Sequence, residues 1–239
     1  MIIDAHVHWR GGTYSGDHRG GPGDLFGALE QAGVSRAVVV GLDPEDDDSI
    51  VDVTTEWKDR LAAFIDVDPA KAGMPAVEEA VRVASGLGES YVRCGSSQLP
   101  EEYFRPVLEI AQAEELPVML HTGDFSYTSP AMMGGMIQQF PKVTFILAHM
   151  GSLAFVWDAI EVARAWPNVY LETSGMTSPR MLRRAVDEIG PERILFGSDY
   201  PYWHPAVERA RIETAELGEV VTQMILGENV SRLLDLEVG

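Results

Sequence analysis

The sequence alternates short apolar runs with segments of helical periodicity along its whole length. Most of the apolar runs hold four to six residues, as is typical of parallel strands that are buried on both faces. Strands are expected at 2–8, 36–41, 61–66, 90–94, 117–121, 143–149, 168–172 and 193–198. Helices are expected near 24–32, 48–58, 75–86, 101–115, 130–140, 152–166, 178–189 and 205–217, with a last helix around 219–235.

This alternation predicts the α/β class, with one (β/α)8 TIM barrel as a single domain over residues 1–239. Pro117, Pro141 and Pro167 each stand at the start of, or shortly before, an expected strand, where a proline ends the preceding helix. The length of 239 residues suits this barrel. An open doubly wound sheet is the alternative, but eight strand–helix units in order favour closure.

Charge and cysteine content limit the partners and the compartment. The chain has 18 Lys and Arg against 37 Asp and Glu, a net charge of −19, which repels phosphate backbones and anionic lipids. We therefore expect no nucleic acid and no membrane as a partner. Cys94 is the only cysteine, and the chain shows neither a signal-peptide pattern nor an apolar run of membrane-spanning length. A cytoplasmic protein is expected, and a homo-oligomer stays open.

Histidines gather where the predicted strands end. His6 and His8 close the first strand, His121 the fifth and His149 the sixth, while Asp199 closes the eighth. The carboxyl ends of the strands of such a barrel meet at one face, which carries the active site. Imidazole and carboxylate groups are the ligands of first-row metal ions. The sequence therefore predicts a metal site at this face.

Spacing suggests how the site is divided. Residues i and i+2 of a strand project to the same side, so His6 and His8 can bind one ion. His121 is a natural third ligand, and Asp199 offers an oxygen ligand together with a base. His149 is expected to polarise a substrate oxygen, to move a proton or to act as a further ligand. A single strand-end histidine is more often a hydrogen-bonded polar residue, but packing does not explain four of them.

Four ordered segments resemble the motifs of the amidohydrolase superfamily. They read DAHVH at 4–8, LHTG at 120–123, LAHMG at 147–151 and LFGSDYP at 195–201. The likeness is to the amidohydrolase 2 branch, which includes aminocarboxymuconate-semialdehyde decarboxylase-like enzymes. The segment 225–233 also resembles the closing helix of that branch.

The resemblance implies that His6, His8, His121 and Asp199 bind one divalent metal ion, most often zinc, with manganese as the second choice. It also implies that His149 is catalytic. Dinuclear relatives carry a carboxylated lysine or a glutamate at the end of strand four. The segment Tyr91-Val92-Arg93-Cys94-Gly95, taken as strand four, holds neither residue, and a mononuclear site is expected.

Two enzymatic functions are compatible with this site, and two further functions are disfavoured. The first is a metal-dependent hydrolase that cleaves an amide, ester or lactone bond of a small molecule through a metal-activated water, with Asp199 as the base and His149 stabilising the oxyanion. The alternative is non-oxidative decarboxylation of an unsaturated or aromatic carboxylic acid by the same residues. A TatD-like nuclease is disfavoured by the net charge and by the missing strand-four carboxylate. The intact ligand set argues against a non-catalytic scaffold.

Residues that bind substrate are also expected at this face. Arg10 and Arg93 have the geometry to pair with a substrate carboxylate, although Arg93 is equally suited to a structural salt bridge. Trp9 and Tyr202 flank metal-site motifs and are expected to line the pocket. The glycine-rich segment 9–23 is either a lid or a loop without a role.

Glu172 and Thr173 end the seventh predicted strand. They are expected either to contact the substrate or to brace the ligands through hydrogen bonds.

Overall fold

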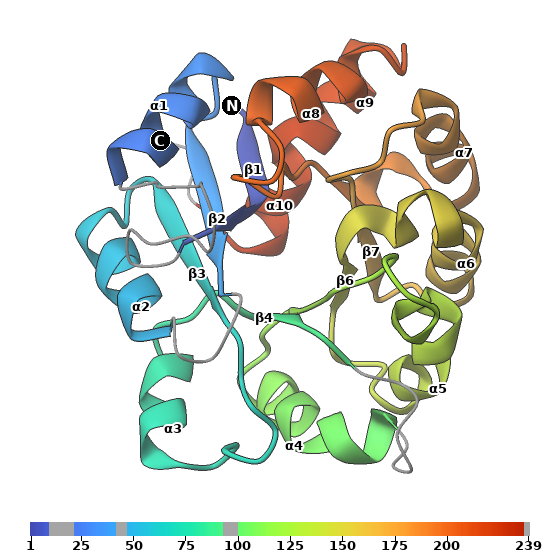
Figure 1. The fold of residues 1–239 in the computed structure, drawn as a ribbon. Helices are drawn as coiled ribbons and strands as arrows, with labels where there is room; N and C mark the ends of the chain where they lie inside the picture. The colour runs from blue at the N-terminus through green and yellow to red at the C-terminus, as the bar shows by residue number, and fades with distance from the viewer. Residues whose placement is uncertain (10–21, 42–46, 93–99, 237–239) are drawn as a thin grey trace.

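Eight parallel strands form the centre of the molecule, and helices surround them (Figure 1). The structure is a computed structural model, described for residues 1–9, 22–41, 47–92 and 100–236. Each strand pairs with the next one along the chain. The strands are β1 (Ile3–His8), β2 (Arg36–Val40), β3 (Leu61–Ile65), β4 (Gly86–Ser90), β5 (Val118–Leu120), β6 (Phe145–Leu147), β7 (Val169–Glu172) and β8 (Ile194–Leu195).

The helices follow the strands one by one, as expected for βα units. They are α1 (Pro22–Gln31), α2 (Asp47–Glu56), α3 (Pro75–Val81), α4 (Pro100–Ala113), α5 (Pro130–Gln139), α6 (Ser152–Ala165), α7 (Pro179–Ile189) and α8 (Pro205–Glu213). The last expected helix consists of α9 (Glu219–Gln223), a π-helical turn at Met224–Glu228 and α10 (Asn229–Leu233). Among the described residues, no helix is both long enough and apolar enough to span a membrane.

Backbone hydrogen bonds join the first strand to the segment that contains the last one. The Ala5 amide donates to the Phe196 carbonyl at 2.8 Å, and the Asp199 amide donates to the His6 carbonyl at 2.7 Å. The sheet therefore closes on itself, and the predicted TIM barrel is confirmed. Closure also brings the last residues of β1 beside those that follow β8.

An irregularity in β1 turns the two histidines into the barrel. The pairing of β1 with β2 shifts register between Asp4 and Val7. Before the shift, Ile3 and Ala5 belong to the buried cluster that includes Val38, Phe64, Met119 and Ile146. After the shift, Val7 packs with the outer core, while the side chains of His6 and His8 meet inside the barrel. Strict alternation would have placed the histidines opposite Ile3 and Ala5.

The strands lie within the expected ranges except β4, although β6 and β8 are shorter than expected. Strand four was expected at 90–94, whereas the structure has it at Gly86–Ser90. Gly88 explains why this strand departs from the apolar pattern. Its φ is +113°, and a Cβ atom there would lie 2.2 Å from the Met119 carbonyl oxygen of β5. The strand needs glycine at this point for its close approach to β5.

Two glycine substitutions should move stability in opposite directions. Gly88→Ala should lower the free energy of unfolding by more than about 2 kcal/mol, because the methyl group meets backbone and the φ is unfavourable. Gly27→Ala is the control, because nothing lies within 4 Å of its Cβ position in α1, and alanine should stabilise the helix by about 0.5–1 kcal/mol. Urea unfolding of both variants checks this, and equal effects would contradict the assigned register of β4.

Candidate metal centre

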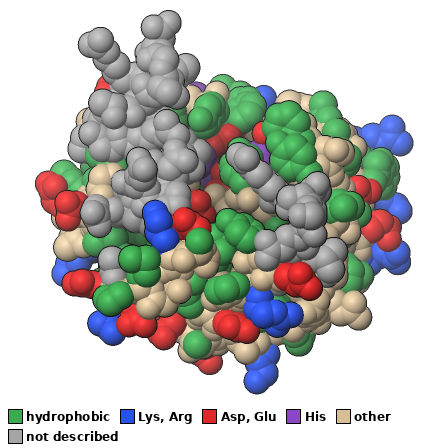
Figure 2. Space-filling model, turned by 60° about the horizontal axis from the view of Figure 1, so that its bottom comes forward, with side chains coloured by type: hydrophobic (Ala, Val, Ile, Leu, Met, Phe, Trp, Pro, Cys, Tyr) green, Lys and Arg blue, Asp and Glu red, His purple; other side chains and the backbone are tan. Residues whose placement is uncertain are grey.

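A hollow of about 380 Å³ opens at the carboxyl ends of the strands. Figure 2 shows histidine and acidic side chains visible between hydrophobic ones on this side of the molecule. Its described lining has no lysine or arginine and consists of His8, Glu89, Tyr91, His121, Asp124, His149, Ser152, Gly175, Asp199, Tyr202 and Trp203. The volume suits a small-molecule ligand.

His6, His8 and Asp199 form the first group of candidate ligands. The Nε2 atoms of His6 and His8 are 3.2 Å apart, and His8 Nε2 lies 2.8 Å from Asp199 Oδ1. All three side chains are buried or nearly so.

Partners on the outer side fix the tautomers of these two histidines. His6 Nδ1 donates to Glu172 Oε2 at 3.1 Å, and His8 Nδ1 donates to the Val40 carbonyl at 3.1 Å. In the neutral form of each ring, the inner Nε2 atom therefore carries the lone pair. Two lone pairs aimed at one point repel each other unless a proton or a metal ion lies between them. This donor set fits a metal ion, with outer hydrogen bonds of the kind that orient metal-binding histidines.

Glu89, His121 and His149 form a second group. Glu89 Oε1 lies 2.8 Å from His121 Nδ1 and 3.2 Å from His149 Nε2. The outer nitrogen of His121, Nε2, lies 2.9 Å from Asp124 Oδ2. The structure thus places His121 with His149 rather than with the pair on β1, where the sequence had grouped it.

Glu89 joins the two groups. Its other oxygen, Oε2, lies 3.3 Å from His6 Nε2 and 3.7 Å from His8 Nε2. One carboxylate therefore presents one oxygen to each group of ligands. The prediction that strand four lacks a carboxylate was wrong, and the mononuclear expectation loses its basis. One of the two arguments against a nuclease falls with it, while the net charge of −19 still argues against nucleic acid.

The sequence pattern did not indicate that Glu89 lies on a strand, because of the residues around it. It lies in the run Gly86-Leu87-Gly88-Glu89-Ser90, in which two glycines break the apolar pattern of a buried strand. The neighbouring run that begins at Tyr91 fits the pattern of a buried strand better, and the pattern therefore predicts the strand there. The sequence did offer one signal for Glu89. It is a carboxylate in the segment between the helices expected at 75–86 and 101–115, one βα unit before His121.

Burial and charge oppose each other inside the cluster. Burial alone would lower the pKa of His6, but the carboxylates of Glu89 and Glu172 raise it well above its usual value. Likewise, burial would lower the pKa of His149, and its hydrogen bond with Glu89 raises this pKa to about 9. Burial would raise the pKa of Glu89, yet the histidines hold it well below its usual range. The cluster therefore favours positive charge between its carboxylates.

Aromatic rings form the walls of the hollow. The Tyr91 ring stacks on His121 with 4.0 Å between centroids and 14° between planes. The Tyr202 ring stands edge-on to His8 at 5.8 Å, beside Trp203. Tyr202 lines the pocket as expected from the sequence, whereas Tyr91 was not anticipated.

Other expected residues do not line the described hollow. Trp9 is 6 % exposed, belongs to the hydrophobic core and is not among the described residues that line the hollow, so its expected place in the pocket stays a prediction. Arg10 and Arg93 lie outside the described residues, as does the segment 10–21, which makes up most of the expected lid.

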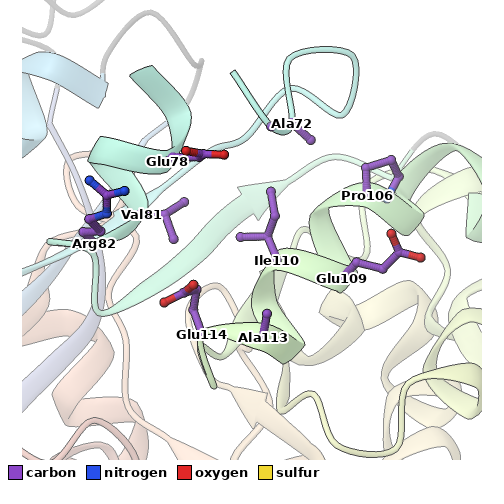
Figure 3. Close-up of a pocket in the computed structure, with 10 residues that line it drawn as sticks. Ala72, Glu78, Val81, Arg82, Pro106, Glu109, Ile110, Ala113 and Glu114 are labelled. Atoms are coloured by element: carbon purple, nitrogen blue, oxygen red, sulfur yellow. The ribbon is translucent and has the colours of Figure 1, made fainter. Parts of the chain in front are cut away.

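A second hollow lies on the outer surface between α3 and α4 (Figure 3). Val81 and Ile110 form apolar walls, and Glu78, Glu109 and Glu114 stand around them. No histidine is among its described lining residues, so it offers none of the nitrogen ligands of the barrel mouth.

Comparison with known proteins identifies the family. The amidohydrolase family model matches residues 3–236, and the chain belongs to this family, as its motifs indicated. Members of this family are enzymes, including decarboxylases and hydrolases.

Curated relatives are distant. The chain is 23% identical over 251 residues to the gamma-resorcylate decarboxylase of Rhizobium sp., a match that covers 79% of this chain and 76% of that one. It is also 23% identical to protein fluG of Emericella nidulans, over 87% of this chain and 31% of that protein. The chain thus spans about a third of the length of fluG.

Solved structures share the fold. The 5-carboxyvanillate decarboxylase of Sphingomonas paucimobilis has a TM-score of 0.75 at 19% identity, over 99% of both chains. A 2-pyrone-4,6-dicarboxylic acid hydrolase homologue from Pseudomonas putida has a TM-score of 0.77 at 18% identity, over 100% of this chain and 98% of that one. A dihydroxybenzoic acid decarboxylase of Polaromonas sp., solved with bound manganese, has a TM-score of 0.73 at 17% identity, over 100% and 98%.

Glu208 of α8 supports the wall of the hollow and should make stability depend on pH. Its Oε2 accepts from the Gly175 amide at 3.2 Å, and its Oε1 pairs with Arg211. Burial raises the pKa of Glu208 to about 7, and the pairing with Arg211 offsets this only in part.

Glu208→Gln should remove this pH dependence. Because the folded-state pKa is raised, the contribution to stability is fully present below pH 4.5 and is lost as the pH rises through 7. The free energy of unfolding of the native protein relative to Glu208→Gln should therefore fall by up to about 3 kcal/mol from pH 4 to pH 8. Urea unfolding measures it, with the more exposed Glu213→Gln on the same helix as the control. A difference that grows with pH would contradict the assigned cause.

Proposed function

We propose that this protein is a metal-dependent decarboxylase that removes a carboxyl group from a small aromatic or unsaturated carboxylic acid without oxidation. Two kinds of observation support it. The chain resembles gamma-resorcylate decarboxylases in sequence, and decarboxylases are among the structures that share its fold. Rings of Tyr91, Tyr202 and Trp203 border the candidate metal centre, as suits a flat unsaturated substrate.

The geometry that carries the proposal is the convergence of imidazole nitrogens on the carboxylates of Glu89 and Asp199. We propose two ions, one held by His6, His8 and Asp199 and one by His121 and His149, with Glu89 between them. A bound ion supplies Lewis acidity toward oxygen atoms of the substrate and of water. Zinc and manganese both accept imidazole and carboxylate ligands, and the manganese in the Polaromonas decarboxylase makes it as good a candidate as zinc.

Asp199 is the proposed proton donor. The carbon atom that loses its carboxyl group keeps the electron pair of the broken C–C bond and takes up a proton in its place. Asp199 lines the hollow, and its Oδ1 is turned toward His8, so its second oxygen can hold the proton. His149 is less suited to this task because Ser174 engages its Nδ1 and its Nε2 faces Glu89. We therefore propose His149 as a ligand.

The charge of the hollow limits how an acid can bind. Glu89, Asp124 and Asp199 line it, and its described lining has no basic side chain. A carboxylate substrate therefore needs positive charge from bound ions, and Arg10 and Arg93 stay proposed partners of that carboxylate from the sequence.

A cytoplasmic location and a homo-oligomer likewise stay predictions from the sequence.

Hydrolysis is the second candidate, and Glu89 favours it. A carboxylate that presents one oxygen to each of two ligand groups is suited to hold two ions close together. Two ions at about 3.5–4 Å are the arrangement in which hydrolases activate water. The substrate would then be a small ester, lactone or amide, with Asp199 accepting the proton of the attacking water.

Metal stoichiometry tests the proposed centre. The purified protein should bind two equivalents of zinc or manganese, and the His6→Ala/His8→Ala and His121→Ala variants should each lose about one. His204→Ala is the control, because this histidine caps α8 and belongs to neither group. Elemental analysis after gel filtration measures the content. A single equivalent in the native protein would contradict the two-ion centre.

Isotope labelling separates the two reactions. With 2,6-dihydroxybenzoate or 5-carboxyvanillate in D₂O, the native protein should release carbon dioxide and place one deuterium on the ring, because Asp199 exchanges its proton with solvent. Asp199→Asn should lower kcat by at least about 10²-fold. Mass spectrometry follows both products. Inactivity toward these acids, with ¹⁸O incorporated from labelled water into 2-pyrone-4,6-dicarboxylate, would favour hydrolysis.

A further inference from the structure

Glu172 and Ser174 lie behind the candidate metal centre, on the side away from the hollow. Both side chains are fully buried at the end of β7. Glu172 Oε2 accepts from Ser174 Oγ at 2.7 Å and from the His149 amide at 3.1 Å. The same oxygen accepts from His6 Nδ1 at 3.1 Å. One carboxylate oxygen therefore meets two of the four histidines of the centre.

Ser174 sets the tautomer of His149. Its hydroxyl group has one proton, which it donates to Glu172, so it must accept a hydrogen bond from His149 Nδ1 at 2.8 Å. The proton of a neutral His149 then lies on Nδ1, and the lone pair lies on Nε2, which points toward Glu89. Without the hydroxyl group, the imidazole loses the partner that fixes this state.

Glu172 also fixes where His149 stands. His149 has a φ of +62°, in the left-handed region that a residue other than glycine rarely adopts. The hydrogen bond from its amide to Glu172 stabilises this conformation at the point where the chain leaves β6. Gly197 leaves room for the carboxylate, because a Cβ atom there would lie 2.3 Å from Glu172 Oε1.

His6 and His149 belong to different ligand groups. We propose that Glu172 and Ser174 are positioning residues that couple the two metal sites, with Ser174 acting mainly on the His149 site and Glu172 acting on both. Without the Ser174 hydroxyl group, Glu172 still accepts from His6 Nδ1 and from the His149 amide. This inference rests on the proposed two-ion centre. His6, His149 and Glu172 also lie close enough together to be ligands of one ion. However, Glu172 Oε2 already accepts hydrogen bonds from His6 and Ser174, so we assign Glu172 a positioning role.

Separate affinities for the two ions test the coupling. The native protein is stripped with a chelator and titrated with Zn²⁺ against a fluorescent competitor. Ser174→Ala should weaken one of the two affinities by about 10- to 100-fold and change the other much less, whereas Glu172→Gln should weaken both. Ser174→Thr, which restores the hydroxyl group, should recover most of the loss.

Thr173 provides a matched control between the two residues. Its hydroxyl group is buried and has no hydrogen-bond partner among the described residues. Thr173→Val, which keeps the shape of the side chain, should change neither affinity. Gly197→Ala is a second variant in case Glu172→Gln does not fold. Its methyl group would meet the Glu172 carboxylate and also the Cβ atom of His6, and it should weaken both affinities. Circular dichroism reports whether each variant is folded.

The tautomer gives a readout that does not depend on activity. In ¹⁵N spectra of the zinc-loaded protein, His149 should carry its proton on Nδ1, and Ser174→Ala should broaden or shift that signal. The proposed coupling would be overturned if Ser174→Ala weakened both metal affinities equally, or if Thr173→Val weakened them as much as Ser174→Ala does. Neither result would overturn the proposed two-ion centre. A native protein that binds no ion would instead overturn the proposed centre, and the coupling with it.

Discussion

The arrangement of the site depends on the closure of the barrel between β1 and the segment that follows β8. The Asp199 amide bonds to the His6 carbonyl, and Asp4 Oδ1 accepts from the amides of both His6 and Ser198, at 3.1 and 2.8 Å. These contacts span almost the full length of the chain. They hold Asp199, a candidate ligand from the last βα unit, against the candidate ligands of the first, which local structure alone cannot do.

Inside this closed sheet, buried charge links stability to chemistry. Glu89 and Glu172 are almost completely enclosed, and an ionised carboxylate without a partner costs several kcal/mol in such a place. The histidines offset this cost, and the carboxylates in turn raise the pKa values of His6 and His149. An interior of this kind favours cations, either protons on imidazole or metal ions between the ligands. Buried carboxylates and imidazoles are costly for the stability of a core, but they are suited to a metal centre.

The fold was predictable in most of its parts because periodicity reports burial. Continuous apolar runs such as Leu61–Ile65 predict buried parallel strands, and the helices between them show their own period. Strand β4 was the exception. Gly88 is required by its close contact with the Met119 backbone, and Gly86 leaves room for the Phe64 ring. Both neighbours lie on other strands, and the pattern of the segment itself does not reveal these contacts. The shift in β1 was hidden for the same reason.

The sequence by itself determined the fold class, the family motifs and the face at which His6, His8, His121, His149 and Asp199 meet. It could do so because strand ends in a parallel barrel share one face, whatever the details of packing. Only the tertiary structure decided how these residues divide into two groups, that Glu89 stands between them, and that Glu172 supports both from behind. Those relations are distances of about 3 Å between side chains on different strands, and register and closure, rather than residue type, set them.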